Sequence, residues 1–237
     1  MIAVIGGSGL AQLPELKITH RQIIRTPYGL PSAPVISGKL GQRDIVFLAR
    51  HGINHTLAPH EINYRANIWA LHSLNVERIV SISAVSSINE AYQPGTLVMP
   101  DDLIDYTYGR HHTFFEGQTQ AIIHTDFSRP YATQWRETLL AHAHERHTHI
   151  HDSAVYGCIQ GPRLPTRAEI RRYRQDGADV IGMTGMPEAI LARELNIPYA
   201  HLCGIIGIDC GEASTNLFRD TQSQETIQLI RQLLVNL

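Results

Sequence analysis

The stretch Ile2-Ala3-Val4-Ile5-Gly6-Gly7-Ser8-Gly9-Leu10 opens the chain with a short apolar run, and a glycine-rich turn follows at once. A run of this kind is typical of a buried strand. Similar short apolar runs recur along the chain and alternate with amphipathic stretches. This alternation predicts an α/β protein whose sheet is largely covered by helices.

The periodicity and the turn residues between the runs place the individual elements. Strands are expected at Ile2–Ile5, Asp44–Ala49, Arg78–Ala84, Thr96–Met99, Ala154–Ile159, Asp179–Met183 and Tyr199–Ile208. Helices are expected at Glu61–Leu74, Tyr131–Ala143, Thr166–Asp176, Pro187–Asn196 and Gln222–Asn236. Thr166 and Glu169 have the spacing of a capping box, and the polar segment from Asp101 to Phe127 is expected to be irregular.

Composition narrows the class of protein before any motif is considered. The 237 residues show no internal repeat and no linker, so a single domain over residues 1–237 is expected. A net charge of −2 gives no support for binding nucleic acid or an anionic membrane. Three cysteines without C-x-x-C spacing, no long apolar run and no visible secretory signal predict a cytoplasmic protein.

Several predicted strands end in residues suited to an anion, at the edge where open α/β sheets bind ligands. Ser8 and its glycine neighbours can cradle a phosphate, although Gln12 replaces the third glycine of a dinucleotide fingerprint. Arg50 offers a planar charged fork, and His51 adds a further polar group. The Thr184 hydroxyl can hold an anion where a helix begins. Each stretch also fits a plain turn, a solvated strand end or a helix cap.

Five histidines, at positions 142, 144, 147, 149 and 151, crowd one short stretch. Spacings of three and four could place imidazoles on one helix face, as a metal site requires. The two-residue spacings and the lack of a nearby cysteine favour an exposed helix end instead, so no metal site is predicted.

The order of these motifs is more specific than any one of them. Gly6–Leu10 is followed by Arg50–Gly52, Asn63–Leu71, Ser83–Val85, Gln160–Arg163 and Gly182–Glu188. This series resembles the trimeric purine nucleoside phosphorylase and methylthioadenosine phosphorylase family over residues 1–210. Within that family, Met183–Glu188 and His124–Ser128 are most similar to bacterial S-methyl-5′-thioinosine phosphorylase.

The resemblance implies a three-layer α/β fold with a mixed, twisted central sheet, in a homotrimer or a dimer of trimers. It also implies that inorganic phosphate is the co-substrate and that no metal or organic cofactor takes part. The implied phosphate site is Ser8, Arg50, His51, Ser83, Ala84 and Thr184. The implied substrate contacts are Met183 under the ribose, Leu164 against the base, His55 at the 5′ substituent and His124 from a neighbouring subunit.

Three positions bear on the base and its surroundings. Gly207 stands where the family has Asn for 6-oxopurines or Asp for 6-aminopurines, so this position offers the base no side chain. Asp209 matches a second acidic position of the methylthioadenosine enzymes, which makes it the candidate catalytic residue and purine contact. Ser86 replaces a glycine of the family, so a crowded backbone is expected beside the phosphate-binding strand.

Four functions stay open on these grounds. The leading hypothesis is phosphorolysis of a 5′-methylthio purine nucleoside, with methylthioinosine ahead of methylthioadenosine. A general purine nucleoside phosphorylase is the second hypothesis. A catalytically silent member that binds a nucleoside or phosphate is the third, and Gly207 keeps it open. A nucleotide-dependent oxidoreductase is the least favoured, because the glycine-rich turn lacks its third glycine.

Overall fold

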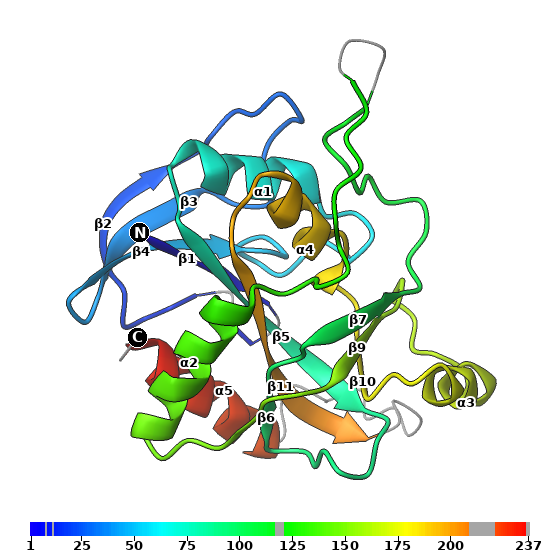
Figure 1. The fold of residues 1–237 in the computed structure, drawn as a ribbon. Coiled ribbons are helices and arrows are strands. Elements are labelled where there is room, and N and C mark those ends of the chain that lie inside the picture. The colour runs from blue at the N-terminus through cyan, green and yellow to red at the C-terminus, as the bar shows by residue number, and fades with distance from the viewer. Residues whose placement is uncertain (8, 11, 117–120, 209–220, 236–237) are drawn as a thin grey trace.

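The computed structural model describes residues 1–7, 9–10, 12–116, 121–208 and 221–235. Within these residues, 11 strands form one mixed sheet and five helices flank it (Figure 1). The strands are β1 (Ile2–Gly6), β2 (Lys17–Gln22), β3 (Val35–Leu40), β4 (Arg43–Ala49), β5 (Arg78–Ser87), β6 (Leu97–Val98), β7 (Asp102–Asp105), β8 (Ile150–His151), β9 (Val155–Cys158), β10 (Val180–Gly182) and β11 (Tyr199–Ile208). The helices are α1 (Tyr64–Ser73), α2 (Thr133–Glu145), α3 (Arg167–Gln175), α4 (Gly185–Glu194) and α5 (Thr221–Val235).

Strand β5 is the centre of the sheet because three other strands pair with it. β1 runs parallel to its first part, from Arg78 to Ser81, and β10 runs antiparallel to its end at Ser86 and Ser87. β11 runs parallel along its other edge, from Ile79 to Ser87. One edge of β5 therefore changes partner between Ser81 and Ser86, and this change opens the sheet where the site lies.

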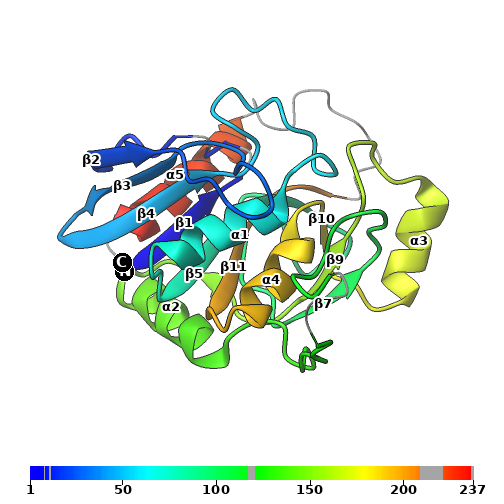
Figure 2. The same ribbon diagram turned by 90° about the horizontal axis from the view of Figure 1, so that it is seen from above.

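The remaining strands extend the sheet on both sides of β5, in the order β2-β3-β4-β1-β5-β10-β9-β7. Off this path, β11 also pairs with β6, and β6 pairs with β8. Helices α1 and α4 pack side by side above the central strands in Figure 1, and α2 and α5 lie below them. Figure 2 shows α3 apart from the other helices, at the end of the molecule beyond β9. Because helices cover the central strands, β1 and most of β5 are buried; β1 is a continuous apolar run, whereas β5 alternates apolar residues with serines.

Most predicted elements are confirmed, with shifts at their ends. β11 has the predicted bounds, and the capping box of α3 is present: the Thr166 hydroxyl accepts from the backbone N–H of Glu169, whose carboxylate accepts from the N–H of Thr166. Gly177 follows this helix with φ of 94°, as expected for a residue that ends a helix in the left-handed region. These signals are local, so the sequence alone is sufficient to identify them.

Four strands were not predicted from the sequence: β2, β3, β7 and β8. β2 is mostly exposed and lacks an apolar run, and it is held by antiparallel pairing with β3. β7 lies in the segment from Asp101 to Phe127 that was expected to be irregular, where it pairs in parallel with β9. Helix α4 begins at Gly185 instead of Pro187, although Met186 and Pro187 have non-helical backbone angles. Among the described helices, none is long and apolar enough to cross a bilayer.

Candidate functional site

A cavity of about 390 Å³ lies where β5 changes partner from β1 to β10. Crevices of this kind, at the ends of strands whose neighbours diverge, are where α/β sheets bind ligands. The polar side chains of the lining include Arg50, His51, His55, Ser83 and Thr184. The apolar side chains include Val85, Ile159, Leu164, Ile181, Met183 and Ile206.

Most residues that the sequence analysis selected for the site line this one cavity. They are Arg50, His51, His55, Ser83, Ala84, Leu164, Met183 and Thr184. His124 is exposed and does not line the cavity; it lies on a segment that extends above the body in Figure 1. Ser8 and Asp209 lie outside the residues that the structure describes.

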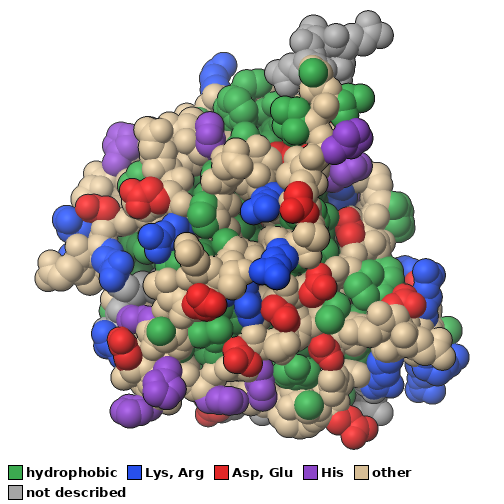
Figure 3. Space-filling view, in the orientation of Figure 1, with side chains coloured by type: hydrophobic (Ala, Val, Ile, Leu, Met, Phe, Trp, Pro, Cys, Tyr) green, Lys and Arg blue, Asp and Glu red, His purple; other side chains and the backbone are tan. Residues whose placement is uncertain are grey.

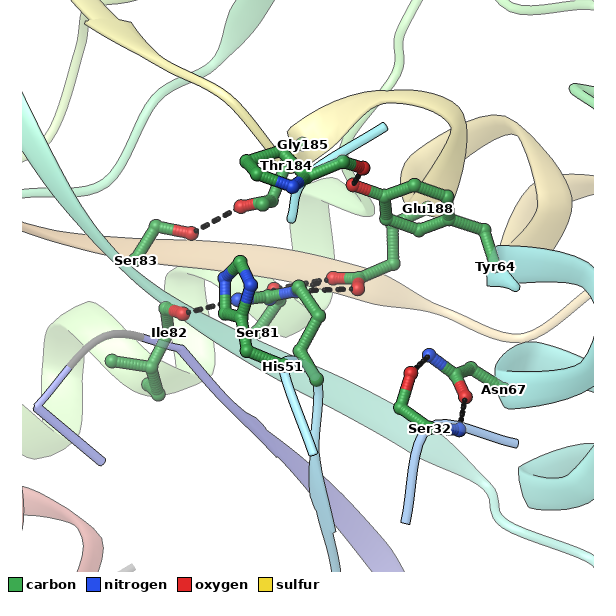
Figure 4. A network of polar contacts seen from close by, with 12 residues as sticks. Ser32, His51, Tyr64, Asn67, Ser81, Ile82, Ser83, Thr184, Gly185 and Glu188 are labelled. Carbon is green, nitrogen blue, oxygen red and sulfur yellow. Dashed lines mark hydrogen bonds and ion pairs between the residues drawn. The ribbon is translucent and has the colours of Figure 1, made fainter. Parts of the chain in front are cut away.

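Arg50 is fully buried and forms an ion pair with Glu188 of α4. Its Nε and Nη2 donate to the two Glu188 carboxylate oxygens at 2.7 and 2.9 Å, and Nη1 donates to the Ile82 carbonyl at 3.0 Å. Ser81 and Tyr199 also donate to Glu188, as Figure 4 shows for Ser81. Burial opposes both charges, but the pair outweighs it, so the pKa of Arg50 is raised and the pKa of Glu188 is lowered.

Among the described residues, this pairing leaves Arg50 with one donor that has no partner. A guanidinium has five N–H groups, and the contacts with Glu188, Ser81 and Ile82 use four of them. The fifth is on Nη1, the atom that also donates to the Ile82 carbonyl beside the cavity. Arg50 can therefore offer an anion one directed hydrogen bond, because Glu188 balances its charge and holds its orientation.

Gly7 is required by the close packing around Arg50. A Cβ at Gly7 would lie 2.5 Å from the Ile82 carbonyl oxygen and 2.7 Å from Arg50 Nη1. Both distances are shorter than real Cβ contacts, so any larger residue would displace Arg50 or the β5 backbone. Gly7 therefore leaves the space that Arg50 occupies, a role that the sequence analysis did not predict.

His51 is held as a neutral imidazole with one defined tautomer. Its Nδ1 lies 2.8 Å from the Leu57 carbonyl oxygen, which can only accept, so Nδ1 carries the proton. Burial and the charge of Arg50 lower the pKa of His51 to about 4. The other ring nitrogen is then an acceptor near neutral pH, so His51 is suited to accept from a ligand hydroxyl or a protonated phosphate oxygen.

Ser83 within β5 and Thr184 after β10 bring two hydroxyls together. Their oxygen atoms are 3.1 Å apart, and they face each other in Figure 4. His201 Nε2 lies 2.8 Å from Ser83 Oγ, whereas His201 Nδ1 is buried and has no partner in the described part of the chain. A bare acceptor costs less to bury than an orphaned N–H, so Nε2 carries the proton and donates to Ser83. The Ser83 proton is then free to point to Thr184 or to a ligand.

The apolar part of the cavity is completed by an irregularity in β11. The register between β11 and β5 shifts between Ile205 and Gly207, so Ile206 is the extra residue of a β-bulge. Bulges redirect side chains, and Ile206 lines the cavity. Ser86 pairs with Gly207 on one side and with Ile181 on the other, so the sheet accommodates Ser86 without losing its register partners.

The sequence analysis missed three residues that shape the site. Glu188 was quoted as part of a motif but was given no role, and its position near the start of a helix indicated nothing about Arg50. His201 lies in an apolar run, where a single histidine gives no sequence signal. Arg110 donates to the carbonyls of Met183 at 2.9 Å and of Gln160 at 2.7 Å, and it thereby ties together two loops that border the cavity.

The buried histidine predicts a pH dependence of stability. Burial and the charge of Arg50 lower the pKa of His201 to about 3, below its ordinary value of 6.5. The unfolded chain therefore binds a proton at this position between pH 6.5 and 3, whereas the folded chain does not. Stability should fall as the pH decreases through this window, by about 2 kcal/mol between pH 7 and 5 from His201 alone. Urea unfolding at pH 7 and 5 measures this loss.

The variant His201→Gln removes the titrating group and should reduce the loss of stability between pH 7 and 5. His20→Gln is the matched control, because His20 is exposed on β2 and its removal should leave the pH dependence unchanged. An equal loss of stability in wild type and His201→Gln would contradict the assignment of a neutral, buried His201.

The histidine run does not form a metal centre in the described part of the chain, where no group of three or more His, Cys, Asp or Glu side chains could hold an ion. His142 and His144 lie in the last turn of α2, and His151 lies in β8. Figure 3 shows histidine side chains along the lower edge of the molecule and others beside the projecting segment.

The two parts of the cavity indicate the chemistry of its ligand. Hydroxyls from Ser83 and Thr184, with one donor of Arg50, form an anion site next to apolar walls from Met183 and Leu164. Such a cavity suits a ligand that combines an anion with a flat or aliphatic apolar group.

Comparisons with known proteins agree with this geometry. Residues 1–235 match the Phosphorylase superfamily. The chain is 47% identical over 212 residues to a Pseudomonas syringae pv. tomato protein named "Probable S-methyl-5′-thioinosine phosphorylase", which covers 90% of this chain and 86% of that protein. It is 42% identical over 221 residues to the 6-oxopurine nucleoside phosphorylase of Pyrococcus furiosus, with 91% and 82% covered.

A solved structure is similar over almost the whole chain. It is a mutant adenosine/methylthioadenosine phosphorylase from Schistosoma mansoni, in complex with methylthioadenosine. The TM-score is 0.94 at 29% identity, and the match covers 99% of this chain and 89% of that one.

Proposed function

This chain belongs to the phosphorylase superfamily, and we propose that it catalyses the phosphorolysis of a purine nucleoside, most specifically S-methyl-5′-thioinosine. The products are the free purine base and a ribose 1-phosphate that keeps the 5′-methylthio group. The observation that supports this proposal best is the meeting of Ser83, Thr184 and Arg50 beside an apolar wall in one cavity. Relatives named for methylthioinosine, 6-oxopurine nucleosides and methylthioadenosine agree on this reaction class.

The polar part of the cavity fits inorganic phosphate. Departure of the purine builds positive charge on the sugar ring, as in other glycosyl transfers with oxocarbenium-like transition states. A phosphate held by the Ser83 and Thr184 hydroxyls and by Arg50 Nη1 stabilises that charge and then bonds to the anomeric carbon. The protein contributes fixed donors, so no metal or organic cofactor is included in the proposal.

The apolar part fits the rest of the nucleoside. Met183 lies next to Thr184 in sequence and lines the cavity, where it can pack under the ribose. Leu164 and Ile181 provide flat apolar surface for the purine. His55 is positioned for the 5′ substituent, and burial together with the charge of Arg50 lowers its pKa, so a neutral ring faces an uncharged thioether.

Four parts of the proposal extend beyond the cavity. Ser8 is proposed as a further phosphate ligand, and Asp209 as the acid or donor that relieves charge on the departing base. His124 is proposed to reach the cavity of a neighbouring subunit in a homotrimer; it is exposed on the segment that also carries the exposed Ile122 and Ile123. The enzyme is proposed to act in the cytoplasm.

Incubation of the purified protein with methylthioinosine, methylthioadenosine, inosine and adenosine tests the reaction class. Each nucleoside is supplied with and without phosphate, and the released base is quantified by chromatography. We expect release of hypoxanthine from methylthioinosine, and only when phosphate is present.

Two other outcomes would change the assignment. Faster release of adenine from methylthioadenosine would move the preferred substrate to the 6-amino nucleoside. If no base were released from any of the four nucleosides in phosphate, the proposed enzyme would be refuted, and a binding protein with the same cavity would be favoured.

A further inference from the structure

The hydroxyl of Ser86 has no hydrogen-bond partner among the residues that the structure describes. Ser86 is only 6% exposed, and its side chain forms no hydrogen bond within the part of the chain that the structure describes. Its hydroxyl oxygen is not fully enclosed, since it is not one of the described side-chain polar atoms that are both completely buried and without a partner. Ser86 is also one of the residues that line the cavity where a ligand would bind.

The other serines of β5 show that this situation is specific to Ser86. Ser81 donates to Glu188 at 2.6 Å, Ser83 contacts His201 and Thr184, and Ser87 donates to the Asn89 carbonyl at 2.6 Å. A buried hydroxyl without a hydrogen bond costs free energy, so a hydroxyl left open to a cavity indicates a ligand or water as its partner.

The surroundings of Ser86 indicate which part of a ligand it would meet. Its register partners are Ile181 on β10 and Gly207 on β11, and both Ile181 and the bulged Ile206 line the cavity. Gly207 has no side chain, so that position places no polar group beside Ser86. Among the described residues, Ser86 is therefore a polar group surrounded by the apolar part of the cavity.

The position along β5 separates Ser86 from the anion site. Ser86 lies three positions after Ser83 on β5. Each strand residue advances about 3.3 Å, so the two positions are about 10 Å apart. That separation places Ser86 beyond the sugar when phosphate is held at Ser83. A purine with its polar edge turned away from the sugar reaches toward such a position.

We propose that Ser86 contacts the polar edge of the purine base, at its 6-substituent, and sets the base specificity of this enzyme. The inference rests on the proposed phosphorolysis and deepens it. A serine hydroxyl both donates and accepts, whereas an amide or a carboxylate presents fixed groups. Ser86 donates to the oxygen of a 6-oxopurine and accepts from the amino group of a 6-aminopurine, so the enzyme uses both nucleosides with rates that differ modestly.

The variant Ser86→Ala tests the contact with three nucleosides that differ only at position 6. They are methylthioinosine, methylthioadenosine and the 5′-methylthio riboside of unsubstituted purine. Ser86→Ala should lower kcat/KM about five- to tenfold for the first two, as expected for the loss of one hydrogen bond. It should change kcat/KM less than twofold for the unsubstituted nucleoside and leave the KM for phosphate unchanged.

Ser87→Ala is the matched control on the same strand. Ser87 is buried and bonded to the Asn89 carbonyl, and it does not line the cavity, so its removal should affect all three nucleosides equally. An equal loss for all three nucleosides in Ser86→Ala, a higher KM for phosphate, or no loss at all would overturn the inference.

The failure of the proposed function gives a different result. In that case the wild-type protein would release no base, and calorimetric titration with free hypoxanthine, adenine and purine would replace the kinetic test. Weaker binding of hypoxanthine and adenine to Ser86→Ala, with purine unaffected, would still support the contact. Equal binding of all three bases to wild type and variant would refute it.

Discussion

Replacing Glu188 with alanine is expected to lower the free energy of unfolding by about 3–5 kcal/mol, the usual cost of leaving one partner of a buried ion pair alone. Both side chains of the Arg50–Glu188 pair are 0% exposed. The variant would keep the Arg50 charge in the interior and would also strand the Ser81 and Tyr199 hydroxyls that donate to Glu188. Urea unfolding, with the midpoint and slope fitted together, measures this loss.

Asp44→Asn provides the comparison for this experiment. Asp44 forms an ion pair with Lys39 at 3.1 Å, but the two side chains are 70% and 53% exposed. Water already solvates these charges, so the midpoint should move far less than in Glu188→Ala. Similar shifts in the two variants would show that the Arg50–Glu188 pair is not the strong internal link that its burial indicates.

Replacing Thr184 with valine is expected to lower kcat/KM for phosphate by about 10²-fold, the lower end of the effect of removing one donor from a preorganised oxyanion site. Valine has nearly the shape of threonine, so the backbone N–H groups of Thr184 and Gly185 should still donate to the Tyr156 hydroxyl at 3.3 Å. The loss should therefore come from the hydroxyl and should appear in kinetics with varied phosphate. The KM for the nucleoside should change much less.

Two further variants separate the hydroxyl from the fold. Thr184→Ser keeps the hydroxyl and should recover most of the activity. Thr138→Val removes an exposed hydroxyl on α2, far from the cavity lining, and should be kinetically neutral. A loss of less than threefold in Thr184→Val would remove Thr184 from the phosphate site.

The predicted effects divide the cavity into separable functions. Thr184 is tested through phosphate, and Ser86 through the substituent of the base. Glu188 touches neither ligand in the proposal, since it holds Arg50 in position. The three experiments have different readouts, so a failure of one does not follow from a failure of another.

The fold class and several residues of the cavity lining could be predicted from the sequence. Buried strands such as β1 and β11 are apolar runs, and the capping box of α3 follows from Thr166 and Glu169. Arg50 and Thr184 follow the ends of β4 and β10, and strand ends meet at one edge of an α/β sheet. Such signals are local or periodic, so they can be recognised in the sequence without knowing which residues are neighbours in space.

The way these residues are used depends on contacts that arise when distant parts of the chain pack together. Arg50 and Glu188 are 138 residues apart, and no local pattern shows that they neutralise each other or that one guanidinium donor stays unused. The roles of Gly7, His201 and Ser86 depend on contacts with β5 and β11 that arise from strand pairing. Burial converts a hydroxyl or an imidazole from a solvated group into a directed one, and burial is a property of the assembled sheet, not of the sequence near the residue.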